Sequence, residues 1–310
     1  MVPSGDLLPD VLPTDRLQRG GQPVPAVRAS LRRIRGARNA WTVVLAWGQA
    51  GVVAGAAIAV DRWWAWPLAV VLMGRTFAQL AILAHEAAHR LLFSSRAAND
   101  RAGRWLLSYP AFVPFDLYRR AHMAHHRDEL GPAEPDAALY AGYPVPAASF
   151  RRKLARDALG VSGWKNLRPL LLGVARPATR RVALPVLAVQ GVLLAAFWAG
   201  GWPQAYLVLW LLPWMTSWRV INRLRAIAEH GGMAPSQDKR RTTHVVRQRA
   251  LARFWMVPYN PGWHLAHHVD PGVPWRELPR LHGELVASGW VTPELHWGSY
   301  SALWRAMRAG

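Results

Sequence analysis

Residues 39–60 read NAWTVVLAWGQAGVVAGAAIAV, a stretch of 22 residues without a charged side chain. As an α-helix, a stretch of this length is about 33 Å long, which is enough to cross a bilayer core about 30 Å thick. Residues 63–84 are also apolar except for Arg75, and residues 182–218 again carry no charge. The sequence Gly200-Gly201-Trp202-Pro203 predicts a turn within this last stretch. We therefore predict four transmembrane helices, at residues 39–60, 63–84, 182–199 and 203–218.

The charged residues flank these apolar stretches. The chain has 310 residues and a net charge of +20. Residues 1–38 carry a net charge of +4, residues 85–181 of +8 and residues 219–310 of +7, whereas the turn between the first two spans holds only Asp61 and Arg62. Positive charge marks the cytoplasmic side of a membrane protein. We therefore predict an all-α, multi-pass protein of the bacterial inner membrane. Both termini are cytoplasmic, residues 1–38 form a loose basic tail, and residues 85–181 and 219–310 form a helical cap.

The composition excludes several other classes of protein. Because the chain has no cysteine, it cannot contain a disulfide scaffold, a thiolate metal site or a thiol nucleophile. A strongly basic chain can also bind nucleic acid, but no zinc finger, recognition helix or aromatic RNA-binding motif accompanies the charge. Membrane orientation and anionic lipid headgroups explain the basic residues more simply. We therefore expect no nucleic-acid partner.

Nine of the twelve histidines gather at a few places on the predicted cytoplasmic side. Two clusters have the pattern HxxHH, one has the pattern HExxH, and one further histidine follows the fourth predicted span. Spacings of three or four residues bring side chains to one face of a helix, so the members of a cluster can reach a common point. Since imidazole binds iron, copper, zinc and nickel, the repeated spacing predicts a metal site. The residues are His85 and His89; His122, His125 and His126; His230; and His264, His267 and His268.

The number of histidines favours two metal ions over one. A tetrahedral zinc site needs only three or four ligands, whereas nine imidazoles fit two ions with four or five ligands each. In an HxxHH cluster the first histidine can share a face with both later ones, while the adjacent pair diverges, which suits two neighbouring ions. Two irons with open coordination positions could activate O2 and attack an unactivated C–H bond. A site at the membrane surface further suggests an aliphatic substrate that arrives from the lipid.

The three clusters, within Ala84–Arg90, Arg120–Asp128 and Tyr259–Pro271, resemble the histidine boxes of the membrane fatty acid desaturase family. The resemblance covers about residues 39–305. It implies a four-helix membrane anchor under a cytoplasmic cap, two irons bound by the nine histidines, and O2 as co-substrate. It also implies that the enzyme introduces a double bond into a fatty acyl or similar lipid chain with electrons from a ferredoxin or a cytochrome. The sequence departs from many relatives at Ala226 and Ala266, where Asn and Glu are common.

Other functions remain open at this point. No HPGG segment of the cytochrome b5 type is present, so we expect a separate electron donor, and a basic face suits an acidic ferredoxin. Hydroxylation or ketolation of a lipid or terpenoid would use the same metal site. Glu86 completes the HExxH motif of zinc proteases, but the hypothesis of a zinc protease leaves both HxxHH clusters unexplained. A non-catalytic metal-binding membrane protein would carry its histidines in low-complexity tracts, which differ from the fixed helical spacing here.

Several single residues carry weaker predictions. Arg75 is costly in lipid, so it should face protein, water or a ligand. His244 is either an extra ligand or an ordinary histidine of the cap or surface, and we interpret His282 and His296 as structural. Acidic residues beside the clusters are candidates for orienting the ligand imidazoles through hydrogen bonds. These acidic residues are Glu86, Asp128, Glu229 and Asp270.

Overall fold

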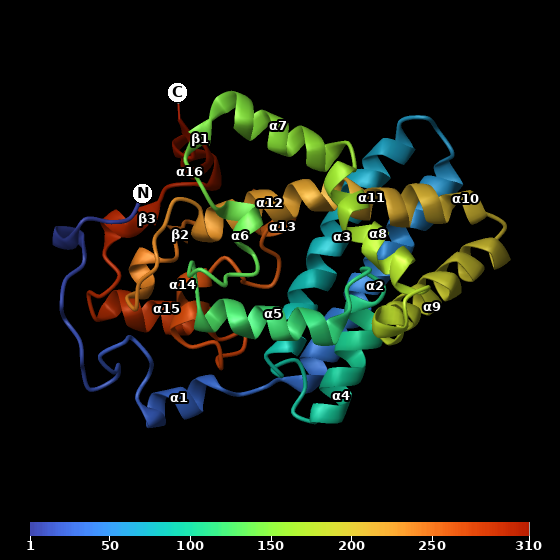
Figure 1. The fold of residues 1–310 in the computed structure, drawn as a ribbon. Helices are drawn as coiled ribbons and strands as arrows, with labels where there is room; N and C mark the ends of the chain where they lie inside the picture. The colour runs from blue at the N-terminus through green and yellow to red at the C-terminus, as the bar shows by residue number, and fades with distance from the viewer. Residues whose placement is uncertain (310) are drawn as a thin grey trace. The chain divides into compact units, whose positions relative to one another are not determined.

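The computed structural model describes residues 1–309, and its ribbon is predominantly helical (Figure 1). Within the described residues the strands are four two-residue segments in two parallel pairs, β1 (Val145–Pro146) with β4 (Arg308–Ala309), and β2 (Val245–Val246) with β3 (His296–Trp297). The prediction of a mainly α-helical protein is therefore confirmed.

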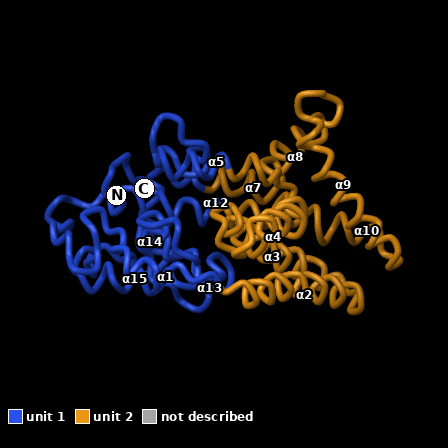
Figure 2. The backbone as a smooth tube through the Cα atoms, turned by 90° about the horizontal axis from the view of Figure 1, so that it is seen from below, with its two compact units in different colours: residues 1–34, 120–150, 223–310 blue, residues 35–119, 151–222 orange. Residues whose placement is uncertain are grey.

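The chain forms two compact units (Figure 2). Unit 1 comprises residues 1–34, 120–150 and 223–310, and unit 2 comprises residues 35–119 and 151–222. One division follows Ile34, and the other three fall within the helices α5 (Phe115–Arg127), α7 (Ala147–Ala158) and α12 (Ser217–His230). The short helices of unit 1 are η1 (Gly5–Leu7), α1 (Pro25–Leu31), α6 (Ala137–Tyr140), η4 (Lys239–Arg241), α13 (Ala250–Trp255), α14 (His264–Val269), α15 (Leu278–Ala287), η5 (Pro293–Leu295) and α16 (Tyr300–Ala306).

Unit 2 contains three helices that are long and apolar enough to cross a membrane, namely α2 (Gly36–Val60), α3 (Ala65–Ala88) and α9 (Pro177–Ala199). Helices α2 and α9 contain the predicted spans 39–60 and 182–199, and α3 covers the predicted span 63–84 from Ala65 onward. Of the apolar window of α3, 67% is buried inside the protein, against 22% for α2 and 17% for α9. Because α2 and α9 expose apolar side chains over most of their surface, a lipid environment suits them and water does not.

The fourth predicted span has a different form from the other three. Residues 203–215 form α10 (Pro203–Tyr206), the π-helical segment Leu207–Leu211 and α11 (Leu212–Met215), and the helix breaks at Thr216. Thirteen residues of helix are about 20 Å long, which is shorter than a bilayer core. The crossing at this position therefore stays a prediction.

Two of the other helical segments of unit 2 pack against α3, and one packs against α9. They are α4 (Arg96–Arg101), the π-helical segment Ala102–Ser108, and α8 (Val161–Gly173) beside α9. On α3 itself, the guanidinium of Arg75 donates a hydrogen bond to Gln49 Oε1, and Gln49 Nε2 donates to Thr76 Oγ1 over 2.9 Å. Arg75 therefore faces protein, as we expected of a charge inside an apolar helix.

Close packing inside unit 2 can be tested at Gly163 on α8. A Cβ atom at this position would lie 2.5 Å from the backbone of Met215. We expect Gly163→Ala to destabilise the protein by about 1–3 kcal/mol, because overpacking forces backbone shifts. Gly191→Ala on α9 is the matched control, since a Cβ there meets nothing within 4 Å. Thermal unfolding should show a lower Tm for the first variant only, and equal Tm values would contradict the packing described here.

The core of unit 1 joins the N-terminal segment to the C-terminal third of the chain. Leu12, Leu17 and Leu31 are buried in one cluster with apolar residues of α14 and α15. Our prediction of a loose tail over residues 1–38 is therefore wrong. The three leucines stand far apart between prolines and charged residues, so they show no helical or strand period that would mark them as core residues.

Candidate metal centre

Four imidazoles from three helices of unit 1 point their Nε2 atoms at one another. His125 comes from α5, His230 ends α12, and His264 and His268 lie one turn apart on α14. The Nε2 separations are 3.4 Å between His125 and His268, 3.1 Å between His268 and His264, and 3.0 Å between His264 and His230. We call these residues the four-histidine group. His125, His230 and His268 are buried, and the side chain of His264 is 11% exposed.

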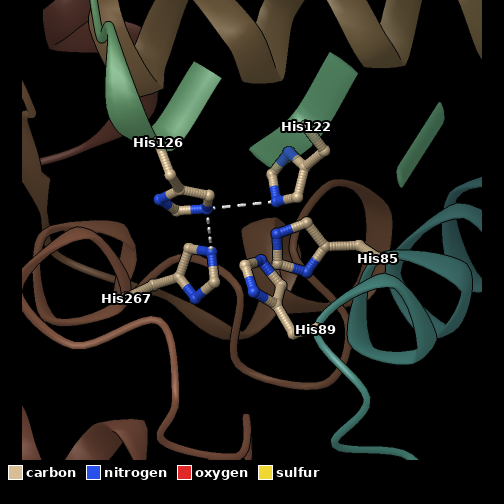
Figure 3. Close-up of side chains that lie close together, drawn as sticks. All are labelled: His85, His89, His122, His126 and His267. Atoms are coloured by element: carbon tan, nitrogen blue, oxygen red, sulfur yellow. Dashed lines mark hydrogen bonds between the residues drawn. The ribbon is translucent and has the colours of Figure 1, made fainter. Parts of the chain in front are cut away.

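A second group in unit 1 comprises His122 and His126 of α5 and His267 of α14. The Nε2 atom of His126 lies 3.1 Å from that of His122 and 3.0 Å from that of His267, as the dashed lines in Figure 3 show. We call these residues the three-histidine group. The HxxHH spacing thus divides each cluster as predicted, because the two adjacent histidines of a cluster join different groups.

The first histidine box lies in unit 2, at the C-terminal end of α3. His85 belongs to the last turn of this helix and His89 is its C-cap residue. Their ring centroids are 4.8 Å apart, and both are drawn in Figure 3. The sequence-predicted ligands therefore come together as seven histidines in two groups of unit 1 and as one pair in unit 2.

Hydrogen bonds fix the tautomers of two imidazoles in the four-histidine group. His125 Nδ1 lies 2.8 Å from a carboxylate oxygen of Glu134, and His230 Nδ1 lies 2.9 Å from the carbonyl oxygen of Thr242. Since both partners only accept, each Nδ1 must carry the proton and each Nε2 is then free to act as a ligand. Four nitrogens 3.0–3.4 Å apart fit around one cation, because metal–imidazole bonds of about 2.1 Å place neighbouring ligands roughly 3.0–3.4 Å apart. The donor set therefore fits a metal ion.

Glu134 fixes the orientation of His125. Besides Nδ1 of His125, its carboxylate accepts the backbone N–H groups of Leu130 over 3.1 Å and Asp136 over 2.9 Å. Burial would raise the pKa of Glu134, but these hydrogen bonds outweigh it and lower the pKa to about 2. Burial lowers the pKa of His125, but the hydrogen bond and charge of Glu134 outweigh it and raise that pKa. The carboxylate is therefore ionised and holds the proton on Nδ1.

Glu129 is the buried negative charge closest to two other imidazoles of the four-histidine group. Its carboxylate lies 3.2 Å from His268 Nδ1 and 3.4 Å from His230 Nδ1. It also accepts hydrogen bonds from Lys239 Nζ over 2.7 Å and from Thr243 Oγ1 over 2.8 Å. Burial would raise the pKa of Glu129, but the nearby His230 and Lys239 lower it. Burial in turn lowers the pKa of His230 to about 4, so this imidazole is neutral and able to bind a metal.

Sequence reasoning did not single out Glu129 or Glu134, because it considered only acids next to the histidines or at their boundaries. Of its four candidates, Glu229 has Oε1 3.6 Å from His264 Nδ1, and Glu86 is buried on α3. Asp128 accepts the N–H of Ala133 over 3.0 Å, and Asp270 binds Arg28. The missed glutamates follow the second box by three and eight residues, and Glu134 lies in a proline-containing loop where helical spacing gives no signal.

The remaining histidines of unit 1 make contacts of another kind. His244 Nε2 donates to the carbonyl oxygen of Gly231 over 2.7 Å, and its Nδ1 accepts from Trp297 Nε1 over 3.1 Å. Both ring nitrogens are thus in use, which favours the structural alternative for His244. The ring of His282 lies at 35° to that of Trp263 with the centroids 4.4 Å apart, and its Nε2 lies 3.4 Å from that of His296.

Comparison with known proteins agrees with these features. The sequence model of the fatty acid desaturase family matches residues 61–304. Dihydrorhizobitoxine desaturase of Bradyrhizobium elkanii is 27% identical over 263 residues, which cover 76% of this chain and 72% of that protein. The chloroplastic omega-6 fatty acid desaturase of Arabidopsis thaliana is 22% identical over 287 residues, which cover 81% of this chain but only 59% of that protein. The match spans more than half of the chain and includes all three histidine boxes, so this chain belongs to the fatty acid desaturase family.

Proposed function

We propose that this membrane oxidoreductase is an O2-dependent di-iron desaturase that introduces a double bond into a fatty acyl or similar lipid chain. The observation that carries this proposal is the convergence of imidazole Nε2 atoms in two groups. In the four-histidine group, buried carboxylates also lie beside Nδ1 of His125 and His268. A site built only of nitrogen and oxygen donors suits iron. Membership of the desaturase family supports iron over zinc.

We assign one iron to each group of histidines. The four-histidine group would hold one iron, and the three-histidine group would hold the other. The support for this division is the spacing of the boxes, in which the adjacent histidines of each HxxHH cluster join different groups. His85 and His89 stay predicted iron ligands because the histidine boxes of the family include the first box.

The bound irons would supply the reduction of O2 that removes two hydrogens from neighbouring carbons. The overall reaction converts –CH2–CH2– and O2, with two electrons and two protons, to –CH=CH– and two water molecules. The protein's own residues prepare the site for it. Glu134 and the carbonyl of Thr242 keep the Nδ1 protons in place, and Glu129 balances the charge of the buried group.

The two electrons would come from a separate carrier. We propose a ferredoxin-type donor, because a chain with a net charge of +20 attracts an acidic protein by long-range electrostatics. We further propose that the site faces the cytoplasm of a bacterial cell, with the basic segments on the same side. The substrate would enter from the lipid phase, since α2 and α9 expose apolar surface.

The relatives are desaturases named for different substrates. One relative is a desaturase named for dihydrorhizobitoxine, and another is named for omega-6 fatty acids. The chain spans only 59% of the length of the omega-6 fatty acid desaturase. We propose a lipid chain because the first histidine box ends a helix that is long and apolar enough to cross a membrane.

Lipid mass spectrometry tests the proposal directly. Membranes from cells that express the chain should contain a lipid that is two mass units lighter than its precursor, and only when O2 is present. Cells that express the His267→Ala variant are the control and should lack this product. A product that is sixteen mass units heavier would instead show a hydroxylase, and one that is fourteen units heavier a ketolase. An unchanged lipid profile with a dehydrogenated water-soluble compound would show a desaturase of another substrate class.

A further inference from the structure

The third histidine box lies on a helix that is too short to be stable by itself. Helix α14 has only six residues, His264–Val269, yet it supplies three of the nine proposed ligands. Isolated helices shorter than about twelve residues are marginal in water, because nucleation of the first turn is costly. The direction of these imidazoles must therefore be set by whatever packs against the helix and holds its ends.

The N-terminal segment supplies this packing. Leu17 and Leu31 are each 1% exposed and share one apolar cluster with Leu265, Ala266 and Val269, which lie between or after the ligands of α14. Gly21 has a φ of +85°, and a Cβ there would lie 3.3 Å from Val269 Cγ1. The chain thus passes close to α14 at a point that favours glycine.

An ion pair fixes the C-terminal end of the same helix. Asp270 is the C-cap residue of α14, two residues after His268, and is 1% exposed. Its two carboxylate oxygens accept hydrogen bonds from Arg28 Nε over 2.5 Å and Arg28 Nη2 over 2.8 Å. One of these oxygens also accepts the N–H of Gly272 over 3.0 Å. A planar guanidinium that binds both oxygens fixes the orientation of the carboxylate as well as its position.

We propose that Arg28 is a positioning residue for the metal centre. Through Asp270 it fixes the end of α14, and so it sets the direction of His267 and His268, which belong to different histidine groups. The inference rests on the proposed function in that it takes these two histidines as iron ligands. It assigns a role in the metal centre to a residue that is 236 or more positions before α14 in the sequence.

The same N-terminal segment contains a matched control. Arg16 binds Glu284 through both carboxylate oxygens, over 2.7 and 2.6 Å. Glu284 belongs to α15, which carries none of the proposed ligands. Arg16→Gln therefore removes an ion pair of the same geometry between the same segment and a neighbouring helix, but leaves the end of α14 unchanged.

The first measurement is the release of iron from the purified full-length protein to a chelator. We expect Arg28→Gln to release iron about 10–100-fold faster than the wild type, as is typical when a partner that orients a ligand is lost. Arg28→Lys keeps the charge but loses the bidentate hydrogen bond, so its rate of iron release should lie between those of the wild type and Arg28→Gln. Arg16→Gln should match the wild type. Equal rates for Arg28→Gln and Arg16→Gln would overturn the proposal.

The second measurement does not depend on the metal. Amide hydrogen exchange of the metal-free protein should be faster over residues 264–270 in Arg28→Gln than in Arg16→Gln, with α15 as the internal reference. If Arg28→Gln does not fold, Arg28→Lys takes its place in the comparison. Unchanged exchange over residues 264–270 would also overturn the proposal.

The iron content of a variant that lacks a proposed ligand separates this inference from the proposed function. If His267→Ala retains all of the wild-type iron, the ligand assignment fails, whatever the behaviour of Arg28. If His267→Ala loses iron but Arg28→Gln retains it as firmly as Arg16→Gln does, only the role of Arg28 fails.

Discussion

Replacement of His125 by alanine should remove the iron from the four-histidine group and abolish turnover. The change deletes one ligand, so the loss of iron affinity should exceed the roughly 10–100-fold typical for a partner outside the ligand set. It also leaves the buried carboxylate of Glu134 without the imidazole that it binds over 2.8 Å. The carboxylate keeps the N–H groups of Leu130 and Asp136, so the loss of one hydrogen bond at this buried group should cost about 1–3 kcal/mol and lower the unfolding temperature.

Metal analysis of the purified variant, together with its thermal unfolding, checks this expectation. His244→Ala is the matched control, because His244 is also a buried histidine with two hydrogen bonds but lies outside both groups. It should lose stability while it keeps its iron. Full iron content and normal turnover in His125→Ala would refute the assignment of His125 as a ligand.

Replacement of Glu129 by glutamine should have the second largest effect. The carboxylate lies within 3.4 Å of Nδ1 in both His230 and His268, and it binds Lys239 over 2.7 Å. The neutral amide keeps the volume but removes the charge that balances Lys239 and orients the two imidazoles. We expect iron affinity to fall about 10–100-fold, the range found when such partners are removed.

Competition with a chelator of known affinity measures this change, and Glu229→Gln serves as the comparison. Glu229 lies 3.6 Å from His264 Nδ1 and 3.3 Å from Arg225 Nε. It therefore faces a single imidazole at longer range, and its replacement should cost less affinity. If the Glu229 variant lost more iron than the Glu129 variant, the balance of contacts described here would be wrong.

The parts of the fold that could be predicted are those with a strong local signal. The absence of charge over residues 39–60 predicts α2, because a helix of this composition has no polar face to turn toward water. The spacing in His122-Met123-Ala124-His125-His126 predicts which imidazoles share a direction, since α5 keeps its 3.6-residue period through the cluster. The division of adjacent histidines between two groups follows from the same geometry.

The features that could not be predicted depend on contacts between distant parts of the chain. Glu134 meets His125 only because the loop after α5 folds back, and the proline-rich sequence of this loop shows no period. Arg28 meets Asp270 across 242 residues, and nothing near Arg28 in the sequence indicates a buried partner. The break at Thr216 is likewise not indicated by the composition of residues 203–218.

Iron-edge anomalous X-ray scattering from crystals of the purified, full-length protein tests the central claim most directly. Our account predicts two iron peaks per chain. One lies within bonding distance of Nε2 of His125, His230, His264 and His268, and the other lies beside Nε2 of His122, His126 and His267. A single peak, a zinc-edge signal in place of iron, or iron away from these nitrogens would contradict the di-iron centre on which the proposed desaturase depends.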